Sequence, residues 1–154
     1  MNTIVIYDSQ YGNTEQIAQA VATALSEFGQ ARAVRVSPAP STELRGVDLL
    51  ILGCPIQGWK PSPAMQAFIE RLEPESLRRL KTACFDTRLR WPSWMRGSAA
   101  DAIAKSLRAL GSEPLLPPEG FLVKGREGPL QSGEVERAAQ WARTLHEKYE
   151  ASRR

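Results

Sequence analysis

The segment of residues 4–15 constrains what this chain can fold into more strongly than any other. It begins with the apolar run Ile-Val-Ile-Tyr, typical of a buried strand, and continues directly into a turn that opens a helix. A helix N-terminus offers unpaired N–H groups and the positive end of the helix dipole, and both favour a bound phosphate. The turn has one glycine and no lysine, so it matches neither the nucleotide P-loop nor the dinucleotide fingerprint. We therefore expect a phosphomonoester site formed by Ser9, Gln10, Tyr11, Gly12, Asn13 and Thr14.

Strand-like and helix-like segments alternate along the chain. Strands are predicted at residues 3–7, 31–36, 48–52 and 82–85 and within 113–123. Helices are predicted from about residue 14 to Gly29, from Ser62-Pro63 onward, at 98–110 and around 135–149. Alternation with short connections indicates right-handed crossovers, and therefore an α/β fold with a parallel sheet and helices on both faces. In such a sheet a ligand binds beyond the carboxyl ends of the strands.

The turn and several later segments resemble the flavodoxins. The likeness lies in Ser-x-Tyr-Gly-Asn-Thr at 9–14, in an apolar strand and loop at 47–55, and in a helix at 97–111. Some small flavodoxin-like proteins also carry Phe-Asp-Thr-Arg and Glu-Gly-Phe-x-Val-x-Gly, found here at 85–88 and 119–125. The resemblance implies a single flavodoxin-like domain over residues 1–154, with a doubly wound five-stranded parallel sheet in the order 2-1-3-4-5. It also implies noncovalently bound FMN, with the phosphate in the turn.

The resemblance further implies which loops hold the flavin ring, namely those after the third and fourth strands. Both loops contain tryptophan, whose indole can stack on a flat ring or pack a loop against the core. Flavodoxins place a glycine in the first loop so that its carbonyl can turn toward the N5–H of the reduced flavin. Gly58 matches this position, with an ordinary turn as the alternative. The expected contacts are Pro55, Ile56, Gln57, Gly58 and Trp59 in the first loop, and Asp86, Thr87, Arg88 and Trp91 in the second, with Trp94 as a further candidate.

The charge of the chain departs from the acidic character usual in flavodoxins. Its formal net charge is +3, and the excess of basic side chains lies in the second half. One of Arg88, Arg90 and Arg96 near the flavin would stabilise an anionic reduced ring; the alternative is that all three form a solvated rim. Nucleic acid is not expected as a partner, because the chain has neither a nucleic-acid-reading motif nor a basic helix face.

The cysteines, the histidine and the apolar runs bear on cell compartment, membrane insertion and metal binding. Cys54 and Cys84 each end an apolar run and lack C-x-x-C spacing, which predicts buried, reduced thiols and a cytoplasmic protein. No signal-peptide pattern stands at the N-terminus, and the longest apolar run is far below the roughly 20 residues that span a bilayer. The only histidine, His146, is expected at the solvated surface, so neither a metal site nor a catalytic residue is predicted.

Three functions fit this sequence. The leading one is an electron carrier between protein partners, in which the polypeptide tunes the flavin and exposes its edge. The alternative is an NAD(P)H-dependent FMN oxidoreductase that acts on a quinone or a similar small acceptor, favoured by the arginines but without a recognisable nicotinamide site. The third is an interaction module that keeps the fold without the flavin, because a fold does not by itself fix a function.

Overall fold

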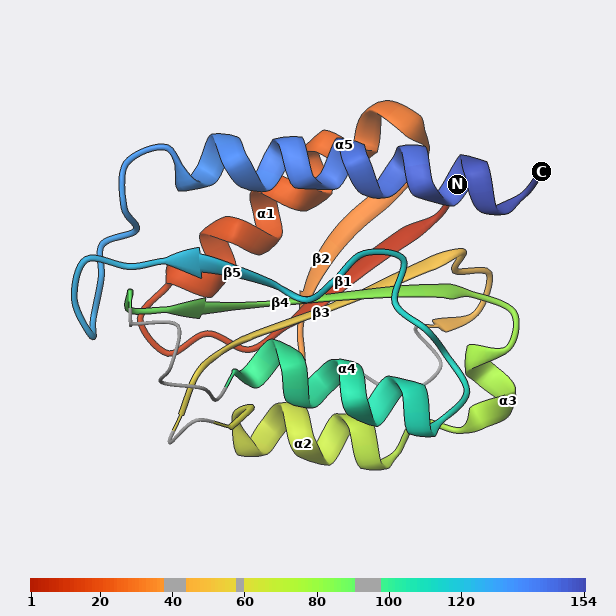
Figure 1. The fold of residues 1–154 in the computed structure, drawn as a ribbon, viewed down its shortest axis with the longest axis horizontal. Coiled ribbons are helices and arrows are strands. Elements are labelled where there is room, and N and C mark those ends of the chain that lie inside the picture. The colour runs from red at the N-terminus through yellow and green to blue at the C-terminus, as the bar shows by residue number, and fades with distance from the viewer. Residues whose placement is uncertain (38–43, 58–59, 91–97) are drawn as a thin grey trace.

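The sheet of this protein has the predicted strand order. The computed structural model describes residues 1–37, 44–57, 60–90 and 98–154. In it, five parallel strands form one sheet in the order β2-β1-β3-β4-β5 (Figure 1). The strands are β1 (Thr3–Tyr7), β2 (Ala31–Arg35), β3 (Leu49–Pro55), β4 (Lys81–Arg88) and β5 (Glu119–Leu122). This order confirms the doubly wound α/β architecture expected from the sequence.

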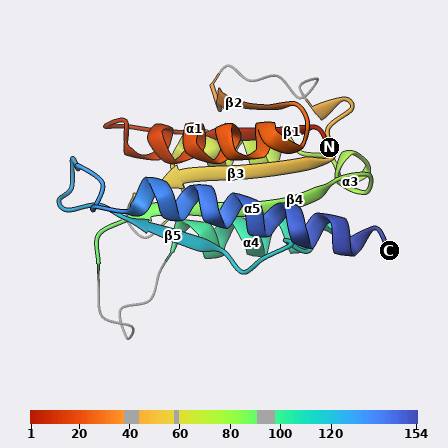
Figure 2. The same ribbon diagram turned by 90° about the horizontal axis from the view of Figure 1, so that it is seen from above.

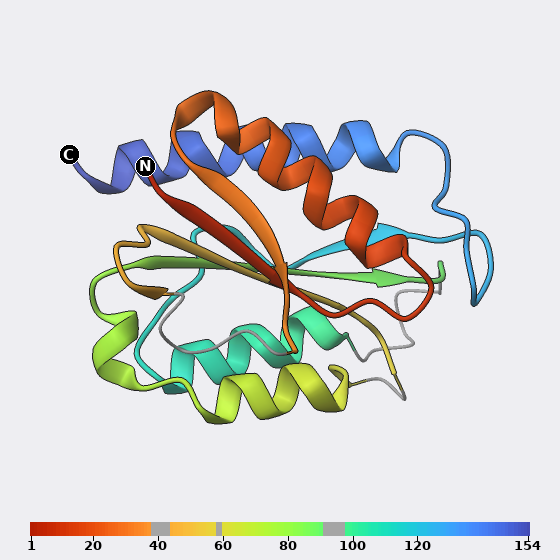
Figure 3. The ribbon, with the colours of Figure 1, turned by 180° about the vertical axis from the view of Figure 1, so that it is seen from behind.

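Helices cover both faces of the sheet. They are α1 (Asn13–Leu25), α2 (Pro63–Glu70), the short α3 (Pro74–Leu77), α4 (Ala99–Ala109) and α5 (Glu134–Ser152), and a 3-10 turn η1 (Ser26–Phe28) follows α1. Helices α1 and α5 lie on one face and α2 and α4 on the other, as the front and back views both show (Figures 1 and 3). Figure 2 shows α1 and α5 side by side in their layer. No helix in the described part of the chain is long and apolar enough to cross a membrane.

The two helical layers pack on opposite faces of the central strands. Every residue of β1 is buried, and its side chains alternate between the faces. Ile4 and Ile6 pack against the α2 and α4 side, whereas Val5 packs against the α1 and α5 side. Trp141 of α5 meets the rings of Phe85 and Phe121 edge-on, with centroids 6.0 and 5.9 Å away. Such aromatic contacts fix α5 against β4 and β5.

Two helix starts follow from local sequence chemistry. The Ser62 hydroxyl accepts a hydrogen bond from the Met65 N–H, and Pro63 occupies the first helical position, as the sequence predicts. The Ser98 hydroxyl likewise accepts the Asp101 N–H at the start of α4. These caps satisfy N–H groups that have no partner within their helices.

Three expectations need correction. The fourth strand does not end at Phe85 but continues to Arg88, because residues 85–88 pair with residues 119–122 of β5. His146 is not a solvated surface residue. Its ring is half-buried and stacks on Phe28 at a centroid distance of 3.7 Å. Val135, expected on the packed side of the last helix, is 40% exposed.

Candidate functional site

The carboxyl ends of the parallel strands bring several distant segments to one edge of the sheet. The chain leaves β1 and β3, which are neighbours, toward opposite faces of the sheet, so this edge is the switch point where ligands bind in such folds. The turn after β1, residues 55–57 and residues 87–90 all lie there, at the left of Figure 1. The sequence therefore predicted correctly which end of the sheet gathers the candidate residues.

Two adjoining hollows open at this edge. One measures about 90 Å³ and lies between the turn after β1, the ends of β3 and β4, and Val123. The other measures about 400 Å³ and continues over Gln57. Both are lined by Gln10, Tyr11, Pro55, Ile56 and Arg126. The larger hollow falls within the range of small-molecule sites in proteins.

The turn after β1, residues 9–14, carries backbone N–H groups that have no acceptor in the described part of the chain, and we call it the donor turn. Gly12 adopts φ +90°, which glycine tolerates and which places it just before the first residue of α1. The Ser9 hydroxyl oxygen accepts the N–H groups of Gly12 and Glu15, at 3.1 and 3.3 Å. Within residues 1–37, 44–57, 60–90 and 98–154, no group accepts the N–H groups of Gln10, Tyr11, Asn13 and Thr14. Four unpaired donors at a helix N-terminus fit the oxygens of a phosphate.

Gly12 is required for its backbone conformation and not for lack of space. A Cβ atom built at this position meets nothing within 4 Å. A side chain at residue 12 would therefore act by straining the positive φ.

Four of the predicted phosphate-site side chains are already bonded to the protein. The Ser9 hydroxyl accepts the two N–H groups named above, and the Gln10 side-chain oxygen accepts a hydrogen bond from the Gln57 amide at 3.3 Å. The buried Asn13 amide donates to the carbonyl of Glu127 at 3.2 Å, which ties the turn to the loop after β5. The Thr14 hydroxyl lies 2.8 Å from that of Thr87 at the end of β4. In such a pair the donating hydroxyl keeps both lone pairs as acceptors, and the accepting hydroxyl keeps its own proton to donate. Tyr11, by contrast, is 43% exposed at the rim of both hollows.

Arg35 places a positive charge beside the turn, and no local sequence pattern had indicated this position. Its guanidinium donates to the Ser9 carbonyl at 2.9 Å and lies 3.8 and 3.5 Å from the carboxylates of Asp8 and Glu15. These bonds hold the turn against β2. Because both carboxylates compete for its charge, Arg35 acts mainly on the shape of the turn.

The loop after β3 reaches the hollows through Pro55, Ile56 and Gln57. The Ile56 N–H donates to the Thr87 carbonyl at 3.3 Å, which keeps this loop beside the end of β4. Gln57 and Lys60 exchange backbone hydrogen bonds of 2.9 and 3.1 Å. Gly58 and Trp59 lie outside the described residues, as do Trp91, Trp94 and Arg96. The stacking rings and the turning carbonyl therefore stay predictions.

Asp86 has a different setting from the one that the sequence suggested. Its side chain is fully buried inside β4 instead of standing in a loop. Its carboxylate accepts two hydrogen bonds from Arg88, at 2.6 and 2.8 Å, and others from the Ser98 hydroxyl and the Ala100 N–H. Burial raises the pKa of the Asp86 carboxyl, and these hydrogen bonds oppose the rise. The Asp86 carboxylate thus joins β4 to the start of α4 and is not presented to the hollows.

The same contacts place Arg88. Its guanidinium lies between Asp86 and Gly120 of β5, where a Cβ atom would collide with it. Arg88 still borders the smaller hollow, but its charge is balanced by a buried carboxylate. Arg88 therefore contributes little of the positive field that we expected near a flavin, whereas the adjoining Arg90 is exposed.

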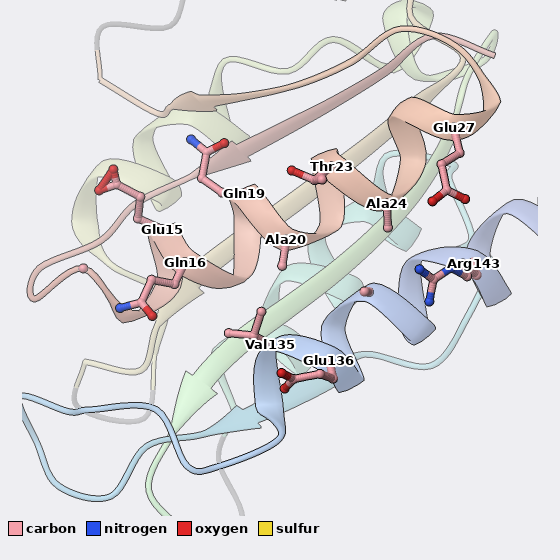
Figure 4. Close-up of a pocket in the computed structure, with 12 residues that line it drawn as sticks. Glu15, Gln16, Gln19, Ala20, Thr23, Ala24, Glu27, Val135, Glu136 and Arg143 are labelled. Carbon is pink, nitrogen blue, oxygen red and sulfur yellow. The ribbon is translucent and has the colours of Figure 1, made fainter.

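A larger hollow lies elsewhere, as an open groove of about 740 Å³ between α1 and α5. Figure 4 shows Val135 of α5 facing Ala20 of α1 across this groove. Its lining combines alanines with glutamates and glutamines. The N–H groups of the donor turn without an acceptor among the described residues adjoin the hollows at the strand ends, so we place the functional site there.

The cysteines and the possible metal ligands of the described residues lie outside this site or apart from one another. Cys54 and Cys84 are buried free thiols, as predicted, and burial raises the pKa of each to about 12. Among the described residues, His, Cys, Asp and Glu side chains form no group of three or more that could hold a metal ion.

The sheet order defines a doubly wound α/β protein. Its donor turn lies at the switch point, where proteins of this architecture bind their ligands. The family described as "Flavodoxin domain" matches residues 4–113, and this chain belongs to that family. A flavodoxin from Nitratidesulfovibrio vulgaris (strain DSM 19637 / Miyazaki F) is 29% identical over 119 residues, which make up 73% of this chain and 78% of that protein.

Solved structures share the whole fold. A flavodoxin from the domain Archaea superposes with a TM-score of 0.80 at 20% identity, covering 97% of this chain and 99% of that one. Rubredoxin oxygen:oxidoreductase from Desulfovibrio gigas superposes with a TM-score of 0.78 at 17% identity, over 97% of this chain. This chain spans only 36% of the length of that oxidoreductase.

Membership in the flavodoxin family implies FMN as the cofactor. The residues at the strand ends fit that molecule. The N–H groups of the turn match a phosphomonoester, and the hollow beside Pro55 and Ile56 offers an apolar wall next to it.

Proposed function

We propose that this chain binds FMN noncovalently as a single domain of residues 1–154 and carries electrons between protein partners. The observation that carries the proposal is the set of backbone N–H groups of Gln10, Tyr11, Asn13 and Thr14, which have no acceptor among the described residues and lie at the switch point of a flavodoxin sheet. Flavodoxins transfer electrons to partner proteins, and this chain belongs to their family.

Different residues at the site contact the phosphate and the flavin ring. The backbone of residues 9–14 receives the phosphate, and Thr14 and Thr87 position the turn beside the end of β4. Pro55, Ile56 and Gln57 flank the flavin from β3; the proposed ring contacts of Gly58, Trp59 and Trp91 complete the site. When bound, FMN supplies the capacity to accept and release one or two electrons.

The reductive behaviour of the purified protein tests this proposal. A carrier should show the visible spectrum of bound FMN and should be reduced slowly by free NADPH but rapidly when a flavodoxin reductase is added. Rapid oxidation of NAD(P)H with a quinone, by the purified protein alone, would instead favour an oxidoreductase. A protein that neither copurifies with FMN nor binds added FMN would favour a flavin-less interaction module.

The pairing of Arg88 with Asp86 bears on the oxidoreductase alternative. That alternative drew its support from arginines beside the flavin, and one of them is neutralised by a buried carboxylate. An electron carrier needs no substrate-binding cation at this place, so the pairing is compatible with the carrier function.

A further inference from the structure

The loop after β5 forms a compact hairpin at the same edge as the donor turn. Val123 and Leu130 pair as an antiparallel bridge, and the Lys124 N–H donates to the Pro129 carbonyl at 2.8 Å. The Gly128 N–H donates to the Gly125 carbonyl at 2.9 Å, which closes the tip of the hairpin around residue 126. Figures 1 and 3 show this loop beside the loop that follows β1.

A hydrogen bond from Asn13 joins this hairpin to the start of α1. The buried Asn13 amide donates to the Glu127 carbonyl at 3.2 Å. Gly128 has φ +105°, and a Cβ atom there would lie 2.6 Å from the Asn13 Oδ1 atom. Both the conformation and the close approach require glycine at residue 128, so the hairpin is held at a fixed place relative to the donor turn.

With the hairpin held by this hydrogen bond, Arg126 lies at the two hollows. Arg126 lines both of them, together with Gln10, Tyr11, Pro55 and Ile56. Within the described ranges no carboxylate pairs with Arg126, whereas Arg35 and Arg88 are each paired with an acidic side chain. Arg126 is therefore a guanidinium at the site that has no ion-pair partner among the described residues.

The donor turn has no positively charged side chain of its own. It contains no lysine, and its neighbour Arg35 is engaged by Asp8 and Glu15. A phosphomonoester carries a charge of about −1.5 to −2 at neutral pH. A guanidinium matches phosphate oxygens with its planar fork of N–H donors, and such charge-assisted bonds are stronger than neutral ones.

We propose that Arg126 is a phosphate-binding residue of the FMN site, supplied by the loop after β5 and held in place by Asn13 and Gly128. This inference rests on the proposed FMN binding and adds a segment that the sequence analysis did not assign to the site. Arg126 gives the chain its preference for the phosphorylated flavin over riboflavin.

The test compares FMN and riboflavin binding by flavin fluorescence in the wild type, Arg126→Gln and Lys124→Gln. Lys124 is exposed in the same hairpin and lines neither hollow, so Lys124→Gln removes the same charge away from the site. Arg126→Gln should raise the Kd for FMN about ten-fold and leave the Kd for riboflavin unchanged. It should also flatten the dependence of FMN affinity on salt. Arg126→Lys should recover part of the loss.

The outcomes separate this inference from the proposed function. If the wild type prefers FMN and Arg126→Gln keeps the full preference, or loses no more than Lys124→Gln does, Arg126 is not a phosphate ligand although FMN binding stands. If the wild type does not bind FMN, the proposed function fails first and this inference with it. Arg126 is exposed and unpaired among the described residues, so unchanged thermal unfolding of Arg126→Gln serves as the folding control.

Discussion

The hydroxyl oxygens of Thr14 and Thr87 lie 2.8 Å apart in a buried contact that joins the first turn of α1 to the end of β4. The two residues are far apart in sequence, and each belongs to a different flank of the proposed site. Their hydrogen bond therefore sets the position of the phosphate turn relative to the ring-binding loops, and both residues also border the smaller hollow.

Thr14→Val should weaken FMN binding several-fold and lower the free energy of unfolding by about 1–2 kcal/mol, because the Thr87 hydroxyl is left buried without a partner. Thr87→Val should cost similar stability. The double variant should recover much of the lost stability, since two apolar groups leave no polar group unpaired. FMN titration and urea unfolding of all three proteins measure both effects. Full recovery of FMN affinity in the double variant would show that Thr14 acts only on the fold.

The pair of the buried Asp86 and the half-buried Arg88 should matter for stability more than an exposed ion pair does. Asp86→Asn leaves the Arg88 guanidinium without its carboxylate, and loss of one partner of a buried pair costs about 3–5 kcal/mol. The matched control is Glu75→Gln, which breaks the exposed pair with Arg78 and should change stability by less than about 1 kcal/mol. Equal unfolding free energies for the two variants would refute the structural role of Asp86.

The thiols of Cys54 and Cys84 should be unreactive while the protein is folded. Burial raises their pKa values to about 12, so almost no thiolate is present at pH 8. Iodoacetamide should label both cysteines rapidly in urea and neither under native conditions, as counted by intact-mass spectrometry. Rapid native labelling of either cysteine would mean that the part of its strand around the thiol opens to solvent.

Local patterns predicted the parts of this protein that local interactions determine. The apolar run of β1 and the turn at residues 9–14 carry their own strand and helix-start signals, and the structure has both. The continuation of β4 through Asp86 was missed, because a carboxylate inside a strand is acceptable only where Ser98 and Ala100 donate to it. These donors are distant in sequence, and no period of two or 3.6 residues reports them.

The position of Arg126 at the site could not be predicted either, because it depends on long-range contacts. Its neighbourhood is fixed by the bond from Asn13 to Glu127, which joins residues 114 positions apart. The one local signal is the pair of glycines that bracket it, Gly125 and Gly128, and the sequence alone does not say which face of the sheet edge such a hairpin meets. The stacking of His146 on Phe28 was missed for the same reason.

The last prediction concerns the acid stability that Glu134 confers at the start of α5. Its carboxylate is 10% exposed and accepts hydrogen bonds from the Leu122 N–H at 2.7 Å and from Arg137 at 2.8 Å. The Arg137 hydrogen bond, assisted by the Leu122 N–H, lowers the pKa of Glu134 below its usual value of 4.5. The group thus contributes stability that is fully present above the unfolded-state pKa and is lost as the pH falls through the lowered folded-state value.

Glu134→Gln should accordingly be less stable than the wild type at pH 7, by about 1.5–3 kcal/mol for loss of hydrogen bonds to a charged group. The difference should shrink below about pH 4.5, because protonation removes from the wild type what the substitution has already removed. Urea unfolding from pH 7 to pH 3 measures it, with the exposed Glu136→Gln as the control for removing one negative charge from the same helix turn. A difference between Glu134→Gln and the wild type that stays constant, or grows in acid, would mean that the ionised carboxylate is not what holds α5 to β5.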